Sequence, residues 1–545
     1  MNKKGFTLIE LLAVILILGI IALIAVPVVN KIVYQSRLLA FKQTVGGVVT
    51  SLANKCNTDV LEGKWNTTYL TIDDGLFSNI YNIDIEGKLP TNASVYIDDE
   101  CDVAIVASDS NFCAVKDYAE DIPIVKNYDK NNCALNDNTV STDESCFLFN
   151  SSTNTITGYD FGNPNCGTNV TIPEKINDIP VHYIEKNSFA GTNQTKKIEY
   201  VNFSKAVNLK KINSGVNTDE GAFANNEIIG ISFGNLKQLS VIGNFAFYNN
   251  RITNLVLPEG LTTLSSTVFG YNYIKSVIFP STMEVIGNWS FRNNLIEEVI
   301  IPESVTSIED GAFYKNAISS VNIPQNNTVI NNFVFAYNQL NKVVLPTNIT
   351  SIGSYAFIDN PMSQINIPSI VTTIGDFAFE DNYLSSITFP SILTNIGAWA
   401  FKNNNLSSIN LSDTITNIGY GAFYNNNLTD VILPTSISSI YGWTFENNRI
   451  NDIVIPNNIT DIGAYAFAGN KSQTLTLGTG LTTIGSLAFT DNNLQQLNIP
   501  NNVVSIAPDA FNNSHNFITF NIDNVNNGIL DSPWGAGNSI INWLR

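Results

Sequence analysis

The chain has 545 residues, too many for one ordinary hydrophobic core, so its length predicts either several domains or an elongated repeat array. Acidic side chains outnumber basic ones by 47 to 28, and the resulting net charge of -19 repels the phosphate backbone of a nucleic acid. A hydrophobic content of 44% with 14% charged residues excludes a disordered chain. We therefore expect a folded protein with no nucleic-acid partner.

The first predicted element is an apolar helix near the N-terminus. Residues 11–29 carry no charged or strongly polar side chain, and with its flanks this run makes a helix of roughly 35 Å, enough to span a hydrocarbon core of about 30 Å. Lys3 and Lys4 precede the run, and the positive-inside tendency keeps such residues in the cytoplasm. The sequence therefore predicts a single pass through the inner or cytoplasmic membrane, with the bulk of the chain outside the cytoplasm.

A carboxylate, Glu10, stands at the edge of this apolar run. An ionisable group costs about 2 to 3 kcal/mol at the centre of a membrane helix and somewhat less near its edge, so its presence indicates a function. A positive charge on a neighbouring chain would offset that cost, and a new amino terminus created between Gly5 and Phe6 would supply one. We expect Glu10 to act in docking between subunits.

The stretch "KKGFTLIELL" resembles the leader and first turns of type IV pilins and of the pseudopilins of type II secretion. In those families a prepilin peptidase cuts after the glycine, the new terminal residue is N-methylated, and the glutamate guides subunit docking. The resemblance implies a leader of residues 1–5, cleavage between Gly5 and Phe6, N-methylation of Phe6, and docking onto other pilin subunits through Glu10. A plain secretory signal differs, because its cleavage site follows the apolar region.

Helical spacing of apolar residues continues past the membrane, so the predicted N-terminal helix covers residues 6–55 and spans the membrane to about residue 29. Residues 56–145 change to short alternating runs such as "ASVYID" and "CDVAIVAS", separated by Asn, Asp and Gly, which indicate a small sheet. A helix followed by a sheet is the pilin plan, and "KLPTNASVYIDDE" with "FCAVKDY" resembles pilin globular domains. We expect a β-rich, disulfide-linked pilin-like domain here.

All six cysteines lie between residues 56 and 166, in a region predicted to be outside the cytoplasm, where thiols become oxidised. We therefore expect disulfides, although six cysteines allow fifteen connectivities and the sequence does not choose among them. No Cys-x-x-Cys pair and no nearby histidine are present, so a zinc site is not expected. The disulfide candidates are Cys56, Cys101, Cys113, Cys133, Cys146 and Cys166.

From Phe247 to Phe511 a phenylalanine recurs every 22 residues, which places thirteen coils in one register. An aliphatic residue stands five positions before each phenylalanine, and pairs such as Val299 with Ile301 stand eight and ten positions after it, so these positions are expected to point inward. An asparagine stands three positions after twelve successive phenylalanines, from Asn250 to Asn492. A fixed turn leaves backbone groups that amides can satisfy, so the asparagines are expected to be structural.

This phrase, "LTxIGxxAFxxNxLxxVxIP", resembles the BspA-like class of leucine-rich repeats, which is found in bacterial surface adhesins. The resemblance implies a β-rich leucine-rich-repeat solenoid over residues 146–545, with irregular opening coils and a closing cap at "DSPWGAGNSIINWLR" that hide its apolar ends. Coils stacked about 4.8 Å apart make a rod of roughly 60 Å. The whole chain is therefore expected to be α+β: a long pilin-type helix, a small β-rich domain and a solenoid of 22-residue repeats.

Two columns of outward residues are candidates for a ligand surface. The apolar column lies nine positions after the phenylalanines, and three of its members in adjacent coils predict an exposed patch. The aromatic column lies two positions before the phenylalanines. The structural alternatives are strand propensity for the first column and partial burial against the next turn for the second, and the sequence favours them over a ligand surface while leaving both explanations open. The candidates are Val256, Ile278, Ile300, Val344, Ile432 and Val454 in the apolar column, and Trp289, Trp399 and Trp443 in the aromatic column.

Nothing in the sequence indicates catalysis. The two histidines, His182 and His515, belong to no recognisable nucleophile constellation, and no glycine-rich phosphate loop follows a strand, so we expect no enzyme, no cofactor and no metal. Two function classes remain. The first is a minor type IV pilin-like surface protein, membrane-inserted before assembly and then extracellular in the pilus. Its repeats would act as an adhesin near the pilus tip and bind a protein or glycan of a host or another cell. The alternative is a pseudopilin of a type II secretion or uptake machine, with the repeats as a scaffold for cargo.

Overall fold

The computed structural model describes residues 142–234, 236–514, 518–522, 533–537 and 539–543, and in addition the backbone of six strands between residues 68 and 127. The chain divides into two compact units, and the second consists of residues 142–231 and 236–545. This boundary lies four residues before the predicted one at residue 146. No helix among the described residues is long and apolar enough to cross a bilayer, and the predicted span at residues 11–29 lies outside them.

The described part of the first unit is one antiparallel sheet with the strand order β2-β1-β3-β4-β5-β6. Thr68 pairs with Ile97 across β1 and β3, and Asn92 pairs with Ser108 across β3 and β4. Strands β3 to β6 form a meander, and β2 pairs with the other edge of β1. All six strands fall within residues 56–145, where the sequence indicates a sheet, and the assignment of this unit as pilin-like stays a prediction. The strands are β1 (Thr68–Asp73), β2 (Leu76–Phe77), β3 (Asn92–Ile97), β4 (Val103–Ser108), β5 (Phe112–Lys116) and β6 (Ile124–Asn127).

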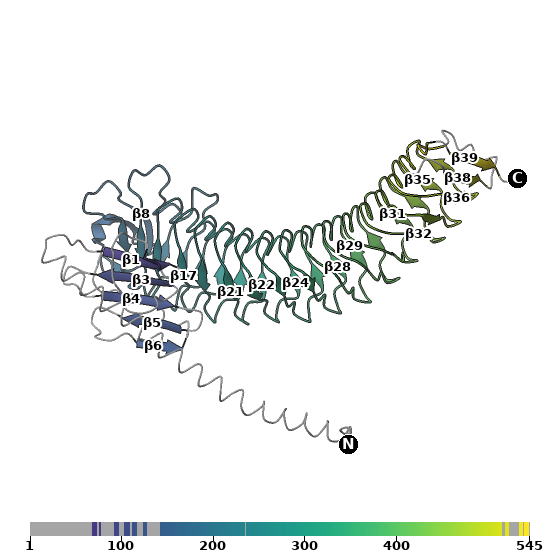
Figure 1. The fold of residues 1–545 in the computed structure, drawn as a ribbon. Helices are drawn as coiled ribbons and strands as arrows, with labels where there is room; N and C mark the ends of the chain where they lie inside the picture. Colours follow the sequence, from purple (N-terminus) through teal and green to yellow (C-terminus); the bar gives the residue numbers. More distant parts are fainter. Residues whose placement is uncertain are drawn as a thin grey trace, which may run out of the picture. The chain divides into compact units, whose positions relative to one another are not determined.

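The second unit is a β-solenoid whose coils follow one another in sequence order along one row (Figure 1). It opens with a 3-10 helix, η2 (Glu144–Cys146), and with two antiparallel hairpins, β7 (Phe147–Asn150) with β8 (Thr155–Tyr159), and β10 (Lys175–Ile176) with β11 (Ile179–Pro180). No α-helix occurs among the described residues of the solenoid, so the helical part of the predicted α+β class rests on residues 6–55, which lie outside them.

Each coil contributes a two-residue strand to a first parallel series, in which the second residue is buried and the first is more exposed. This is the strand predicted from the aliphatic residue five positions before each phenylalanine. The first series consists of β12 (Tyr183–Ile184), β14 (Lys211–Ile212), β16 (Val241–Ile242), β18 (Thr263–Leu264), β20 (Val285–Ile286), β22 (Ser307–Ile308), β24 (Val329–Ile330), β26 (Ser351–Ile352), β28 (Thr373–Ile374), β29 (Asn395–Ile396), β30 (Asn417–Ile418), β31 (Ser439–Ile440), β33 (Asp461–Ile462), β35 (Thr483–Ile484) and β37 (Ser505–Ile506).

A second parallel series lies seven to nine residues after the phenylalanines and so includes the inward position predicted eight residues after each, and most coils contribute to it. Its strands pair in register, as in Leu255 with Val277 and Ile453 with Leu475. The second series consists of β9 (Asn169–Thr171), β13 (Tyr200–Asn202), β15 (Gly230–Ser232), β17 (Asn254–Val256), β19 (Ser276–Ile278), β21 (Glu298–Ile300), β23 (Ser320–Asn322), β25 (Lys342–Val343), β27 (Gln364–Ile365), β32 (Asp452–Val454), β34 (Thr474–Thr476), β36 (Gln496–Ile499), β38 (Thr519–Ile522) and β39 (Ile540–Trp543).

The core between the two series is a stack of phenylalanine rings. From Phe247 to Phe511, neighbouring rings lie 5.3 to 5.8 Å apart between centroids and within 18° of parallel, and the rings are buried. Burial of an aromatic side chain removes a large apolar area from water, and each coil repeats that gain. The register predicted from the sequence is therefore the register of the core.

The asparagine ladder holds the coils together beside this stack. Asn404, for example, donates from Nδ2 to the carbonyl oxygens of Phe379 (2.8 Å) and Phe401 (3.2 Å), and its Oδ1 accepts from the backbone N–H of Leu384 (3.0 Å). The same pattern recurs at Asn272, Asn294, Asn338, Asn426, Asn448 and Asn492. The structure confirms the structural role predicted for these amides.

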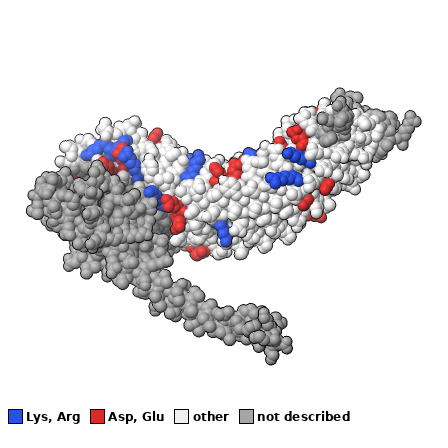
Figure 2. Space-filling view, in the orientation of Figure 1, with Lys and Arg blue, Asp and Glu red and all other residues white. Residues whose placement is uncertain are grey.

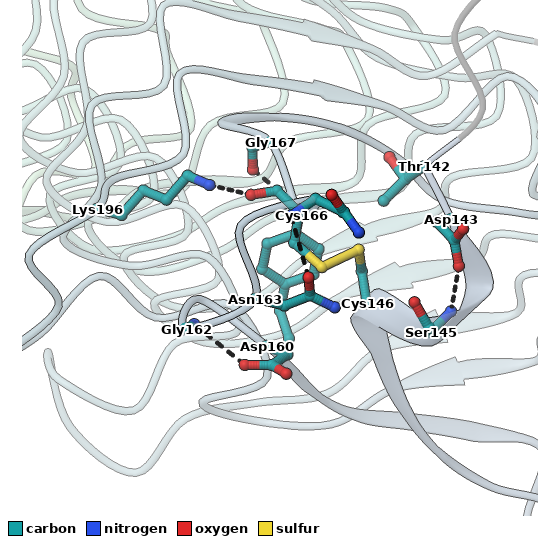
Figure 3. The surroundings of a disulfide bond; sticks show 12 residues. Thr142, Asp143, Ser145, Cys146, Asp160, Gly162, Asn163, Cys166, Gly167 and Lys196 are labelled. Carbon is teal, nitrogen blue, oxygen red and sulfur yellow. Dashed lines mark hydrogen bonds between the residues drawn. A yellow bond between two sulfur atoms is a disulfide. The ribbon is translucent and has the colours of Figure 1, made fainter.

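Caps close both ends of the solenoid. At the opening end Cys146 and Cys166 form a disulfide, with their Cα atoms 5.6 Å apart, and Lys196 donates to the carbonyl oxygen of Cys166 (Figure 3). At the closing end Trp534 is fully buried and packs edge-on against Phe520 at 5.2 Å. A stacked array leaves one apolar surface uncovered at each end, and these irregular segments cover it.

Candidate functional site

Some of the predicted site residues belong to the described part of the chain, and others lie outside it. Gly5, Phe6 and Glu10 lie outside the described residues, so cleavage, methylation and docking stay predictions. Cys146 and Cys166 are bonded to each other. The side chains of Cys56, Cys101, Cys113 and Cys133 lie outside the described part, and their pairing stays a prediction.

The apolar column is exposed over part of its length. Ile432 is 81% exposed, Val344 72%, Ile300 63% and Val454 56%. Ile432 and Val454 occupy adjacent coils, whereas Asn322 separates Ile300 from Val344. These four side chains therefore make small apolar spots.

The prediction that Val256, Ile278 and Ile300 form an exposed patch is wrong, because Ile278 is 7% exposed and Val256 is half-buried. Val256 pairs with Ile278 in the parallel register of β17 and β19, and Ile300 occupies the same position in the next coil. Ile278 thus has a β-branched residue at the same position of the coil on each side. A position that points outward along one strand is only as exposed as its neighbours allow.

The aromatic column is half-buried, and its rings stack on one another. Phe333 lies 4.5 Å from Tyr355, and Tyr355 lies 4.6 Å from Phe377, with the planes within 10° of parallel. The aromatic residues of the column have φ between +56° and +60°, a left-handed conformation that costs about 1 to 2 kcal/mol for a residue with a side chain. Stacking offsets this cost, and it covers ring faces that a ligand would need.

The two tryptophans Trp289 and Trp399 each lie over a glycine of the next coil. A Cβ atom placed on Gly311 would lie 2.2 Å from Cε3 of Trp289, and one on Gly421 would lie 2.2 Å from Cε3 of Trp399. Because Gly421 has no side chain at this position of the intervening coil, Trp399 reaches Trp443 two coils away, at 6.1 Å between ring centroids. This geometry supports partial burial, rather than a ligand surface, as the reason for the tryptophans.

Sequence analysis missed two exposed tyrosines on neighbouring coils, Tyr420 at 49% and Tyr441 at 38% exposure. Their ring centroids lie 4.9 Å apart with the planes tilted by 34°, and Tyr420 also contacts Trp443 at 6.3 Å. We call Tyr420 and Tyr441 the tyrosine platform. The signal was present in the sequence, because "IGYGAF" and "IYGWTF" are the two phrases among thirteen that place an aromatic three or four positions before the phenylalanine.

One carboxyl on the same turn as this platform has a raised pKa. Burial raises the pKa of Glu446 to about 7, and its Oε2 is buried without a hydrogen-bond partner. Three coils earlier, Glu380 is almost fully buried and pairs with Lys402 at 2.6 Å; burial raises its pKa despite the lysine. Lys402 in turn lies 5.4 Å from the Trp399 ring centroid.

Charged side chains are sparse elsewhere on the solenoid. On the face shown in Figure 2, most of the described surface carries neither charge, and basic and acidic residues form small separate groups. Among the described residues, no group of three or more His, Cys, Asp or Glu is placed to hold a metal ion. The described surface therefore offers aromatic and amide groups more than ionic ones.

Comparison with known proteins agrees with this geometry. A model of the BspA type leucine rich repeat region (6 copies) matches four overlapping segments, which together run from residue 141 to residue 533 and cover well over half of the chain. The segments are residues 141–295, 240–362, 350–473 and 443–533. The chain belongs to the BspA-type leucine-rich repeat family. A model of the prokaryotic N-terminal methylation motif matches residues 1–26. No curated protein matches the chain.

Solved structures with a similar fold are bacterial leucine-rich repeat proteins. One from Bacteroides ovatus is 20% identical, with a TM-score of 0.51, and the match covers 73% of this chain and 98% of that one. A leucine rich cell surface protein from Faecalibacterium prausnitzii is 20% identical over 75% of this chain and 96% of its own, with a TM-score of 0.35. The pneumococcal vaccine antigen PcpA is 16% identical over 81% of this chain and 98% of its own, with a TM-score of 0.37. The first likeness supports the BspA-type solenoid fold.

Proposed function

We propose that this protein is a minor type IV pilin-like subunit whose BspA-type repeats act as an adhesion module near the pilus tip. The observation that carries the proposal is the presence of both features in one chain, a methylation motif at residues 1–26 and repeats at residues 141–533. The first feature inserts the subunit into the membrane and then into a filament. The second extends a rod with exposed aromatic and amide groups, which suits binding rather than catalysis.

The proposed partners follow from the two ends of the molecule. A prepilin peptidase cleaves after Gly5, and other pilin subunits pack against the N-terminal helix, with Glu10 paired to a neighbour's amino terminus. The repeats bind a molecule on a host or other cell. The protein is thus a single-pass membrane protein before assembly and is extracellular in the pilus afterwards.

The test combines one chemical and one biological measurement. N-terminal mass spectrometry of the surface protein is expected to find a chain that begins at N-methylated Phe6, whereas an intact Met1 terminus would refute the pilin proposal. Cells that produce a chain lacking residues 146–545 are expected to assemble pili and to adhere less than the wild type. Full adhesion by these cells would refute the adhesion proposal.

The leader also resembles that of pseudopilins, so a component of a secretion or uptake machine is the second candidate. In that case the repeats hold cargo, and the mature protein stays in the cell envelope. Protease treatment of intact cells separates the two functions, because a pilus subunit is digested from outside and an envelope-enclosed pseudopilin is protected.

A further inference from the structure

We propose that the tyrosine platform is a binding site for the pyranose rings of an uncharged glycan. This inference rests on the proposed adhesion function and names the class of molecule that the repeats recognise. It starts from a departure from the repeat. In the thirteen coils, the position three residues before the phenylalanine is aromatic at Tyr420 alone, and the position four residues before it is aromatic at Tyr441 alone.

Tyr420 lacks a hydrogen bond that several other coils make at the same position. In other coils a short polar side chain at this position accepts from a backbone N–H of the next coil, as Asn332 does from Ser354 at 2.8 Å and Asp376 does from Ala398 at 2.7 Å. A tyrosine has no oxygen close enough to its backbone to replace that acceptor. Tyr420 therefore supplies no hydrogen bond of this kind to the next coil.

Tyr441 stands where most coils have glycine. A Cβ atom at this position in the neighbouring coils would lie 2.4 Å from the backbone N of Ala398 at Gly419, and 2.5 Å from the backbone N of Gly442 at Gly463. The largest side chain in this column thus occurs where the space is tight, and in the coil directly after Tyr420. Two costly and adjacent departures from a regular repeat indicate a function at that place.

The platform is backed by other aromatic rings and is open to solvent. Trp443 supports Tyr420 from one side, and Tyr465 in turn stacks on Trp443 at 5.8 Å and 10°. The two tyrosine rings remain 49% and 38% exposed. Tyrosine provides a large contact area for little loss of side-chain entropy, because it has two rotatable bonds. The electron-rich face of such a ring attracts the C–H groups on one face of a pyranose.

Asparagine amides lie on the same coils as the platform. Asn417 donates to Asn395 at 2.7 Å, Asn425 donates to Asn403 at 2.8 Å, and Asn447 donates to the Tyr424 hydroxyl at 3.3 Å. An amide has two N–H donors and a carbonyl that accepts twice, so each of these bonds leaves capacity for a sugar hydroxyl. Aromatic faces beside amides match the two sides of a pyranose, which presents C–H groups on its face and hydroxyls at its rim.

The charge of the protein and the size of the platform favour an uncharged glycan over an acidic glycan or a protein partner. The chain has a net charge of -19, which repels sialylated and uronic glycans. A protein partner needs a larger apolar centre. The exposed apolar residues of these two coils, Ile432 and Val454, lie nine positions after the phenylalanine and not on this turn. The turn offers two rings and several amides, which suits one or two sugar units.

The experiment measures binding of the full-length protein in detergent to an array of uncharged and acidic oligosaccharides, followed by titration of the best ligand with tryptophan fluorescence as the signal. The test variant is Tyr420→Ser with Tyr441→Ser, since Ser354 and Ser265 occupy these positions in other coils. The control is Tyr383→Asn, which removes a tyrosine that is 61% exposed and replaces it with the residue that Asn405 supplies in the next coil. Near-ultraviolet circular dichroism checks that both variants are folded.

We expect an uncharged oligosaccharide to bind the wild type and the control equally, and the double variant at least about tenfold more weakly. Absence of any uncharged ligand, or equal binding by the folded double variant, overturns the inference. Cell adhesion assays distinguish failure of the glycan site from failure of the proposed adhesion function. Normal adhesion by the double variant overturns the glycan site and leaves the adhesion function intact. Lost adhesion without glycan binding assigns the platform to a protein partner and also overturns the inference. Full adhesion without the repeats refutes the adhesion function itself.

Discussion

Asn404 is 5% exposed, and its single amide joins three backbone segments on neighbouring coils. Its Nδ2 and Oδ1 satisfy carbonyl and N–H groups that the turn would otherwise leave buried and unpaired. A buried polar group left without a partner costs about 1 to 3 kcal/mol. A hydrogen bond that merely replaces one made to water in the unfolded chain contributes less. Amides at this position are therefore more important for stability than their size suggests.

We predict that Asn404→Ala lowers the free energy of unfolding of the coils around it by about 2 to 4 kcal/mol, since it leaves the N–H of Leu384 and the carbonyl of Phe379 without this partner. The midpoint of urea unfolding measures the effect. The control is Asn405→Ala, because Asn405 is the next residue along the chain and its side chain is exposed. Equal midpoints for the two variants would contradict the prediction.

Glu446 is the residue with the clearest expected pH dependence. Its pKa rises through burial from 4.5 to about 7 in the folded protein, so between these values the folded chain keeps a proton that the unfolded chain has lost. Its contribution to stability is complete below pH 4.5 and is lost as the pH rises to about 7.

We therefore predict that the urea midpoint of the wild type falls over this pH window relative to that of Glu446→Gln, which cannot ionise. Unfolding titrations of both proteins at several pH values measure the difference. Parallel curves for the two proteins would show that Glu446 does not titrate in this window. The matched control is Glu303→Gln, an exposed glutamate of another coil, which is expected to leave the pH profile unchanged.

The coil is the next scale, and its stability depends on its two neighbours. Phe401 stacks on Phe379 at 5.3 Å and on Phe423 at 5.7 Å, and β29 of its coil pairs with β28 and β30 of the adjacent coils. A coil in isolation would leave both faces of its ring and both strand edges uncovered. Terminal coils need other means of closure for this reason, and a change in a cap acts first on the coils next to it.

Removal of the disulfide of the opening cap tests whether a change in a cap acts first on the coils next to it. The disulfide closes a loop between residues 20 positions apart, and in a chain-entropy model its loss costs about 3 kcal/mol. We predict that Cys146→Ser with Cys166→Ser raises hydrogen exchange in residues 142–212 and leaves the central coils, residues 330–470, unchanged. Exchange followed by mass spectrometry measures both segments. A uniform loss of protection along the whole solenoid would show that the array unfolds as one unit.

At the scale of the whole molecule, the size of the repeat unit bears on the place of the subunit in a filament. Thirteen regular coils stacked about 4.8 Å apart make a rod of roughly 60 Å. In a helical filament the stems of neighbouring subunits pack side by side, so a rod on every subunit would compete for the same space. The tip is free of this crowding.

We predict that the protein is a minor subunit at or near the pilus tip. Immunogold labelling of sheared pili with an antibody to residues 240–510 is expected to place one or a few particles at filament ends. An antibody to the major shaft subunit is the control and is expected to label the whole length. Dense, even decoration of the shaft by the first antibody would contradict the prediction.

Much of the solenoid could be predicted from the sequence, because a repeat makes local rules visible many times over. The 22-residue spacing from Phe247 to Phe511 is the core register, and the asparagines from Asn250 to Asn492 make the ladder expected of them. Both depend on interactions that recur in every coil. The closing cap was also visible, since an array with an open apolar end requires one.

Only the tertiary structure decided which outward positions are exposed and which side chains meet. Ile278 and Ile432 occupy the same position in their repeats, yet the first is 7% exposed and the second 81%. Cys146 could have paired with any of five partners, and the fold of the opening coils brings it to Cys166. Tyr420 and Tyr441 are 21 residues apart in the sequence, and stacking of their coils brings the rings to 4.9 Å. A local period determines which way a side chain points, whereas exposure and contact depend on the side chains of neighbouring coils.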